Sequence, residues 1–189
     1  LEDRLNKVTR SIGNAQFDYK IHGLEDLSVN LNLGYDILRS KYNRTVPELA
    51  GMMYTGNQKD GTGLVYNSIQ DKSNLLLDAY ANYHHNWGGK HDFSAMAGYG
   101  WQHFWRKYDA TNHDPEGNEL SAKRHYKTEY YLVSWYGRLN YSFADRYLLT
   151  ATLRADASSR FAKDNRWGYF PSVAAAWRVI CLLYTSPSP

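Results

Sequence analysis

The sequence predicts an all-β fold, an antiparallel up-and-down transmembrane β-barrel, of which this chain supplies an incomplete set of about seven strands. Apolar and polar residues alternate one by one in seven stretches, and a period of two places successive side chains on opposite faces of a strand. The links between these stretches alternate between short and long, as they do in barrels of the outer membrane. Aromatic residues make up 15% of the 189 residues, a high share that is typical of barrels with aromatic girdles.

The predicted strands follow from this alternation. In the clearest one, residues 27–37, Leu27, Val29 and Leu31 alternate with Ser28 and Asn30. The complete set of predicted strands is 14–22, 27–37, 75–84, 93–102, 133–143, 147–156 and 172–179. Each has one apolar face and one polar face, so each is expected to be half in contact with lipid and half with the lumen. We expect Asp78, Arg138 and Arg154 on the lumen wall.

The links predict which end of each strand faces outward. Short turns are expected at residues 23–26, 88–90 and 144–146, where Gly88 and Gly89 suit a tight hairpin. Long polar loops are expected at residues 40–72 and 108–130, and a loop of medium length at 157–169. If the short turns face the periplasm, the loops face the outside of the cell.

Aromatic residues on the apolar faces sort into two belts, as expected where rings lie at both lipid interfaces. The belt near the short turns contains Tyr19, Trp87, Phe93, Tyr141, Phe143, Tyr147 and Trp177. The belt nearer the loops contains Tyr35, Tyr99, Trp101 and Trp135. The alternative is a soluble antiparallel sandwich, whose apolar faces would pack inward around scattered aromatic residues.

Composition excludes several classes. The chain has no run of about 18 apolar residues, which excludes a transmembrane helix. A net charge of +3 without a basic cluster gives no reason to expect a nucleic-acid partner. The single Cys181 supports neither a disulfide framework nor a zinc site. The first ten residues are charged and polar, so they do not form a signal peptide.

Seven strands are too few for a closed bacterial barrel, which needs an even number of at least about 8. We therefore expect residues 1–179 to be a partial outer-membrane β-barrel domain, cut from a larger barrel. After Val179 the alternation stops, and residues 180–189 fit neither a strand nor a hairpin. This tail resembles translated read-through of a sequencing adapter, and we expect it to be non-native.

A long motif lies in residues 147–178. Its first part follows a strand that ends in Arg-x-Asp, and its second part leads into an alanine-rich strand with Trp-Arg. The matching residues are Arg154, Asp156, Ser158, Ser159, Arg160, Phe161, Asn165, Arg166, Trp167, Gly168, Tyr169, Phe170, Pro171, Ser172, Trp177 and Arg178. This stretch resembles the SusC/RagA family of TonB-dependent outer-membrane transporters. Ala157 stands where the family commonly has glycine. The resemblance is sharp over residues 133–178 and looser elsewhere.

The resemblance implies a plugged barrel of about 22 strands in the bacterial outer membrane. Such a transporter takes up glycans or peptides, draws energy through the TonB complex and works with a SusD-type surface lipoprotein. Its partners would therefore be outer-membrane lipids, that lipoprotein, the TonB complex and a glycan or peptide substrate, with no cofactor. The plug and the TonB-contacting segment are expected outside these residues. The alternatives are a plug-less outer-membrane pore or adhesin, and a soluble β-rich binding domain.

The motif residues also have a structural interpretation. Charges at Arg154 and Asp156 are tolerated on a lumen face, and Arg160 could pair with Asp156 or Asp164. Pro171 begins a strand, where its missing N–H does no harm. We therefore expect the motif to brace a junction between a strand and a loop.

No catalytic or metal-binding residues are predicted. His84 and His85 are adjacent, so on a strand they face opposite sides. Oxygen ligands for calcium occur near residues 109–116, but their spacing lacks the calcium-loop pattern and fits a solvated turn better. The residues concerned are Asp109, His113, Asp114 and Glu116. We find no G-x-S-x-G, H-E-x-x-H or P-loop motif, so no enzyme activity is expected.

Tyrosines in or beside the expected long loops are the candidate substrate contacts. They are Tyr54, Tyr66, Tyr108, Tyr126, Tyr130 and the adjacent Tyr131. Flat rings beside amide and carboxylate side chains could stack on sugars and hydrogen-bond to them. The alternative is that these rings only pack the loops against each other.

Overall fold

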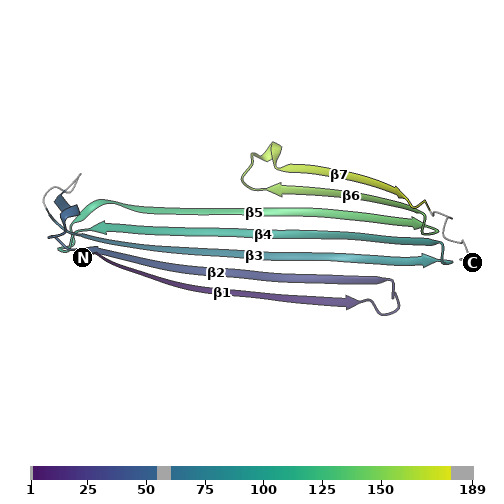
Figure 1. The fold of residues 1–189 in the computed structure, drawn as a ribbon, viewed down its shortest axis with the longest axis horizontal. Helices are drawn as coiled ribbons and strands as arrows, with labels where there is room; N and C mark the ends of the chain where they lie inside the picture. Colours follow the sequence, from purple (N-terminus) through teal and green to yellow (C-terminus); the bar gives the residue numbers. More distant parts are fainter. Residues whose placement is uncertain (1, 55–60, 180–189) are drawn as a thin grey trace, which may run out of the picture. The chain divides into compact units, whose positions relative to one another are not determined.

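The computed structural model describes residues 2–54 and 61–179, and within them seven strands form one sheet in chain order, β1 to β7 (Figure 1). The strands are β1 Asp3–Lys20, β2 Leu27–Val46, β3 Leu64–Trp87, β4 His91–His113, β5 Glu119–Phe143, β6 Tyr147–Ser158 and β7 Trp167–Trp177. Two short 3-10 turns, η1 Gly51–Tyr54 and η2 Lys163–Asn165, lie in the connections. The prediction of an all-β, antiparallel sheet is confirmed. The predicted non-native tail lies outside the described residues.

None of the helical segments in the described part of the chain has the length and apolarity that a membrane crossing needs.

The chain divides into two compact units, each of which takes segments from several strands. Unit 1 comprises Leu1–Asn14, Gly34–Leu75 and His103–Tyr130. Unit 2 comprises Ala15–Leu33, Leu76–Gln102 and Tyr131–Pro189.

Strand register sorts the side chains by parity. In the antiparallel pairs β5–β6 and β6–β7, Leu139 lies opposite Ala151, which lies opposite Val173. The next positions place Asn140 opposite Thr150. Residues that share a cross-strand position therefore share parity, and side chains alternate along each strand. We call the two sides the odd face and the even face, after the residue numbers.

The odd face of unit 2 is apolar and exposed. Leu139 is 50% exposed, Leu153 54% and Val173 73%. A soluble sandwich would bury these side chains between two sheets. A large exposed apolar face is instead the surface that a barrel wall presents to lipid.

Aromatic side chains on this odd face touch one another across strands. Near the short turns, the Phe143 ring lies 4.9 Å from His91 and 6.4 Å from Tyr147, between ring centres. Nearer the other end of unit 2, the Tyr99 and Trp135 rings lie 4.7 Å apart. Trp135 and Phe143 are eight positions apart on β5, close to the length of about 9–11 residues with which a tilted strand crosses a membrane. Within each of the two predicted belts, rings on neighbouring strands therefore lie against each other.

The odd face of unit 1 is charged. Arg39 pairs with Asp71 at 2.6 Å, and Lys107 pairs with Asp109 at 2.9 Å. Lys123 pairs with Glu119 at 2.8 Å. These pairs are exposed, so each contributes little to stability. They show that the odd face of unit 1 is suited to contact with water and not with lipid.

The predicted long loops are wrong in their extent. Strand β2 continues to Val46 and β3 begins at Leu64, so the first loop is residues 47–63 instead of 40–72. Only residues 114–118 separate β4 from β5, where the prediction had 108–130. Strand β1 begins at Asp3 and not near residue 14, and β7 begins at Trp167. The reason is physical, because in unit 1 both faces of the strands are polar, and the apolar–polar contrast that reveals a strand is lost.

The described side chains of the first connection pack onto strand ends. Val46, Met53 and Leu64 form a small buried cluster, with Leu120 packed against it. Gly63 has a φ of +75°, and an added Cβ there would lie 3.0 Å from the ring of Pro115. This connection is therefore anchored to the β4–β5 turn within unit 1.

Candidate functional site

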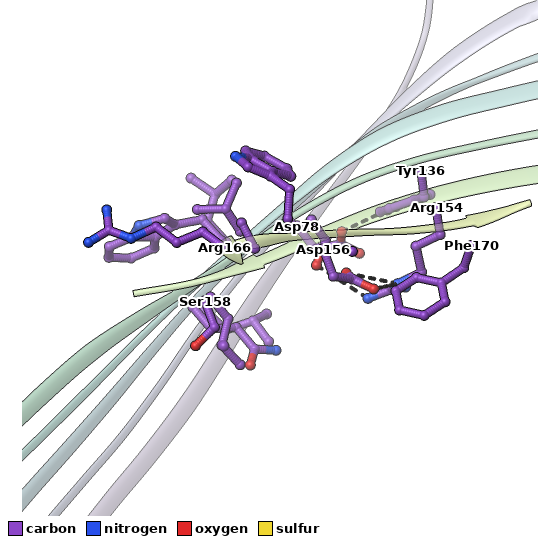
Figure 2. A pocket seen from close by; sticks show the side chains of 18 of the residues that line it. Asp78, Tyr136, Arg154, Asp156, Ser158, Arg166 and Phe170 are labelled. Atoms are coloured by element: carbon purple, nitrogen blue, oxygen red, sulfur yellow. Dashed lines mark hydrogen bonds and ion pairs between the residues drawn. The ribbon is translucent and has the colours of Figure 1, made fainter. Parts of the chain in front are cut away.

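A hollow of about 790 Å³ lies on the even face of unit 2 (Figure 2). Strands β3 to β7 and the β6–β7 connection line it, and most of its polar groups come from the motif and from facing strands. Asn32 also lines the hollow, and its buried Oδ1 has no hydrogen-bond partner among the described residues. A buried acceptor without a partner is costly, so a water or another segment would stabilise it there.

The motif residues Arg154 and Asp156 form an ion pair on the wall of this hollow. Because they are two positions apart on β6, both side chains lie on the even face. Arg154 Nε donates to Asp156 Oδ1 at 3.0 Å and to Oδ2 at 2.8 Å. Arg154 Nη2 also donates to Ser134 Oγ on β5 at 3.2 Å. Figure 2 shows the pair with its dashed lines.

Tyr136 on β5 links this ion pair to Asp78 on β3, so that polar groups of three strands form one wall of the hollow. Its hydroxyl donates to Asp78 Oδ1 at 2.7 Å. The Arg154 guanidinium carbon lies 5.9 Å from the centre of the Tyr136 ring, at the outer limit of a cation–π contact. Asp78, Tyr136, Arg154 and Asp156 thus form one connected polar chain across the sheet. Such a wall keeps its charges paired where water, a plug or a solute could meet it.

The serines of the motif hold the β6–β7 connection against β5. Tyr131 N donates to Ser159 Oγ at 2.8 Å, and Ser159 N donates to Tyr131 O at 3.0 Å. Arg160 N donates to Ser158 Oγ at 3.3 Å. Arg166 Nε donates to Phe161 O at 3.1 Å, which closes the connection on itself. This geometry agrees with a bracing role for the motif, which stays a prediction.

The remaining motif residues lie on both faces of β7. Phe170 lies on the even face, and an added Cβ on Gly168 would lie 3.1 Å from its ring. Trp167, Tyr169 and Trp177 are 45%, 67% and 65% exposed on the odd face. The other motif positions are Asn165 in η2, Ser172 opposite Thr152, and Arg178, whose N–H donates to Arg146 O at 2.7 Å. The prediction that Pro171 begins a strand is wrong, because Pro171 lies inside β7, opposite Leu153, on the last strand of the described sheet, where a missing N–H is tolerated. The motif therefore contributes to the hollow through even-numbered residues of β6 and β7, and also through Phe161, Asn165 and Trp167 in and beside the β6–β7 connection.

A second candidate surface lies on the even face of unit 1. Tyr42, Tyr66, Tyr108 and Tyr126, one from each of β2 to β5, form a row that we call the tyrosine ladder. The Tyr42 and Tyr66 rings meet edge to face, with 6.0 Å between centres. The hydroxyls of Tyr66 and Tyr108 lie 2.6 Å apart, and the Tyr108 and Tyr126 rings stack at 4.9 Å. The hydrogen bond with Tyr66 raises the pKa of Tyr108, and burial adds to the shift.

Arg106 lies beside this ladder. Its guanidinium carbon is 5.5 Å from the centre of the Tyr126 ring. In the amide orientation that satisfies both groups, the Gln70 oxygen accepts from Arg106 Nη2 at 2.6 Å and from Nε at 3.1 Å. Phe104 and Tyr130 form a further stacked pair on the same face, with 4.7 Å between ring centres. Arg106 and Tyr126 are the exposed members of this aromatic surface, where a solute can meet a guanidinium beside an aromatic ring.

The structure places the sequence-predicted tyrosines on strands, not in loops. Tyr66, Tyr108 and Tyr126 come together in the ladder, and Tyr130 lies with Phe104. Tyr131 lies on the odd face, 6.1 Å from the ring of Trp101. The side chain of Tyr54 lies outside the described part of the chain. The sequence analysis missed Tyr42, although counting by two from Leu38 would have placed it on the face of Ser40 and Arg44.

The residues considered for calcium serve other roles. Asp114 Oδ1 accepts from Asn118 N at 2.7 Å, and Asp114 Oδ2 accepts from Asn118 Nδ2 at 2.8 Å, so it closes the β4–β5 turn. These bonds with Asn118 lower the pKa of Asp114. Asp109 contacts His125 and Lys107. In the described ranges, no three His, Cys, Asp or Glu side chains converge as metal ligands would.

Comparisons with known proteins agree on one family. The model of the family described as "TonB dependent receptor-like, beta-barrel" matches residues 2–186. TonB-dependent receptor SusC of Bacteroides thetaiotaomicron is 39% identical over 176 residues, which are 89% of this chain and 17% of that protein. TonB-dependent receptor P39 of Formosa agariphila is 27% identical over 165 residues, 81% of this chain and 15% of that protein.

Solved structures show the same fold. The structure of the RagAB peptide transporter has a TM-score of 0.77 and 20% identity, covering 97% of this chain and 21% of that chain. At this identity the likeness concerns the fold alone. The chain spans less than a quarter of the length of each of these relatives, at 17%, 15% and 21%.

Proposed function

Because this chain belongs to the TonB-dependent receptor-like β-barrel family of the bacterial outer membrane, we propose that it is part of the wall of a transporter that imports glycans or peptides. The observation that carries the proposal is the contrast between the two faces of unit 2, of which the exposed one is apolar and the other is polar. Its exposed odd face is apolar and carries contacting aromatic rings. Its even face carries the ion pair of Arg154 with Asp156, and Asp78 bonded to the Tyr136 hydroxyl. A wall of this kind faces lipid on one side and a polar lumen on the other.

Each unit has a distinct role in this proposal. The odd face of unit 2 contacts outer-membrane lipids, and its even face lines the lumen against a plug. The buried Oδ1 of Asn32 then accepts a hydrogen bond from the plug or from lumenal water. The even face of unit 1 offers the tyrosine ladder as a contact for the solute.

The proposed partners follow the relatives. SusC is named a TonB-dependent receptor, and the RagAB structure is described as a peptide transporter. We extend to the whole protein an energy supply through the TonB complex and a SusD-type surface lipoprotein as the second component. The substrate class is a glycan or a peptide. None of these relatives is named as an enzyme, which fits transport without chemistry on the substrate.

Uptake by cells that carry the full-length gene tests this proposal. The tagged protein should fractionate with the outer membrane and co-purify a lipoprotein. Deleting the gene should abolish uptake of an oligosaccharide or peptide too large for general porins. Removing TonB function should abolish the same uptake.

The contrary outcomes are specific. Uptake that persists without TonB function but disappears with the gene would establish a plug-less pore instead. Unchanged uptake of every solute in the deletion strain, with the protein in the outer membrane, would point to an adhesin. A protein found in the soluble fraction would contradict the barrel wall altogether.

A further inference from the structure

The even face of unit 1 carries an excess of positive charge. The described strand segments of this face, together with Glu2, have six cationic residues and two carboxylates. The cations are Arg4, Arg10, Arg44, Lys72, Arg106 and Arg124, and the carboxylates are Glu2 and Asp36. The odd face of the same segments is almost balanced, with six cations against five carboxylates. The two faces therefore differ in which solutes they attract.

The carboxylates of the even face already have arginine partners. Glu2 accepts from Arg4 Nε at 2.7 Å and also pairs with Arg44. Asp36 pairs with Arg10 at 2.8 Å. Neither carboxylate is therefore left to balance the charge at the tyrosine ladder.

Arg106 lies over the ladder ring of Tyr126, and its partners among the described residues are uncharged. They are the amide oxygen of Gln70 and the ring of Tyr126. Gln70 uses two of the five N–H donors that a guanidinium has, which leaves about three for another group. The Arg106 side chain is exposed, and Tyr126 is 42% exposed, so both can be reached from solvent. Guanidinium donors in a fork match a carboxylate particularly well.

The surroundings of Arg106 favour a sugar over a peptide. Rings on neighbouring strands are spaced by about 4.8 Å along the sheet. Because Tyr108 and Tyr126 stack on each other, the ladder presents ring edges with hydroxyls at their tips. A bound peptide would need partners for its main-chain N–H and C=O groups. On the face of a paired sheet these backbone groups are already used in the strand ladder. A sugar needs side-chain polar groups to hydrogen-bond with and some apolar surface to lie against, and the hydroxyls and ring edges of the ladder supply both.

We propose that the tyrosine ladder and Arg106 bind an acidic oligosaccharide, with the tyrosine hydroxyls and ring edges against the sugar and Arg106 against a carboxylate of the sugar. This inference rests on the proposed transport function and names the substrate class for it. It adds a selectivity for uronic-acid-containing chains over neutral ones.

Binding of matched oligosaccharides to the full-length protein tests the inference. The protein is purified in detergent with any lipoprotein that co-purifies. It is presented with oligomers of galacturonate, glucuronate and mannuronate, each beside its carboxyl-reduced counterpart. We expect at least one acidic oligomer to bind, and its reduced counterpart to bind about tenfold more weakly because the charged hydrogen bonds are lost. This comparison needs no variant and does not depend on how a mutant folds.

Variants then assign the effect to the ladder. R106Q should weaken the acidic oligomer about tenfold and leave the reduced one unchanged. Y126A should weaken both oligomers. K107Q is the matched control, because Lys107 lies next to Arg106 on the same strand but on the odd face, paired with Asp109. Binding by K107Q should equal that of the wild type.

Three results would overturn the inference. They are equal binding of acidic and reduced oligomers, binding of none of the acidic oligomers, or an acid preference that survives R106Q. If a neutral glycan or a peptide is bound and imported instead, the inference fails while the proposed transport function stands. If the uptake experiments find no imported solute, the transport function itself fails.

Discussion

Tyr136 on β5 hydrogen-bonds to Asp78 on β3 at 2.7 Å, across the strand that separates them. The contact exists because Gly98 lies beneath the ring on β4. A Cβ at Gly98 would lie 2.3 Å from Cζ of Tyr136, closer than atoms can approach. The missing side chain on one strand thus lets its two neighbours share a hydrogen bond. The polar wall of the hollow depends on this arrangement.

Gly98→Ala should therefore destabilise the protein. The added methyl must displace the Tyr136 ring, at a cost of about 1–3 kcal/mol for an overpacked site. The measurement is the thermal unfolding of the full-length protein in detergent. Gly100→Ala is the control on the same strand and face, because its added Cβ would have ordinary contacts at 3.6 Å. Equal loss of stability in the two variants would refute the role given to Gly98.

The bond between Tyr136 and Asp78 should be measurable as a coupling. We expect Tyr136→Phe and Asp78→Ala, which remove the donor and the acceptor, to show an interaction free energy of about 1.5–3 kcal/mol, as for a hydrogen bond to a charged group. A double-mutant cycle on unfolding in denaturant isolates this value. Additive effects of the two substitutions would mean that the bond contributes nothing to stability.

The turn between β5 and β6 stores backbone strain. Ala144 and Asp145 have φ of 51° and 54°, the left-handed region that suits glycine. The β3–β4 turn uses the same region with Gly88 and Gly89, at φ of 58° and 70°. Ala144→Gly should stabilise the folded protein by up to about 1 kcal/mol, since an L-residue pays roughly that amount there. The reverse change, Gly88→Ala, should destabilise it. Thermal unfolding of the full-length protein in detergent measures both effects.

Acid should weaken the ion cluster of unit 1. Hydrogen bonds from Arg4, and then from Arg44, lower the pKa of Glu2 from 4.5 to about 2. A lowered pKa means that the ionised pair stabilises the fold above pH 4.5, and that this stabilisation disappears as the pH falls from 4.5 to about 2. We therefore expect Glu2→Gln to lower the unfolding temperature at pH 6, with a difference that vanishes near pH 2. The control is Asp3→Asn on the opposite face. A pH-independent difference would contradict the pairing.

The sequence alone predicted the strands of unit 2 well and those of unit 1 poorly. Alternation from Tyr147 to Ala155 is clear because lipid-facing and lumen-facing positions differ sharply in polarity, and the observed register with β5 and β7 follows it. Around Arg39 and Lys41 the odd face is as polar as the even one, so the pattern resembles a loop. A strand that has water on both sides needs no contrast between its faces.

The candidate site could be predicted only in part, for a related reason. Tyr66, Tyr108 and Tyr126 were identified by their position in or beside the expected long loops, and Arg154 and Asp156 by the motif. Which rings meet depends on cross-strand register, which is set by turn lengths that the predicted loops had wrong. The hydrogen bond that spans β4 depends on Gly98 of that strand, whereas the motif begins two strands later, on β6. No local pattern marks such a residue.

The two faces of β6 give the sharpest test of the membrane orientation. Leu153 is 54% exposed on the odd face, and Thr152 is its neighbour on the even face. If the odd face contacts lipid, Leu153→Arg should cost about 2–4 kcal/mol near the middle of the membrane. Thr152→Arg places the same charge toward the lumen and should cost much less. Two measurements on the full-length protein report the difference. One is the heat-modifiable mobility on a gel, which shows whether the barrel has assembled, and the other is folding into lipid vesicles. If Thr152→Arg is the more damaging of the two, the faces have been assigned the wrong way round.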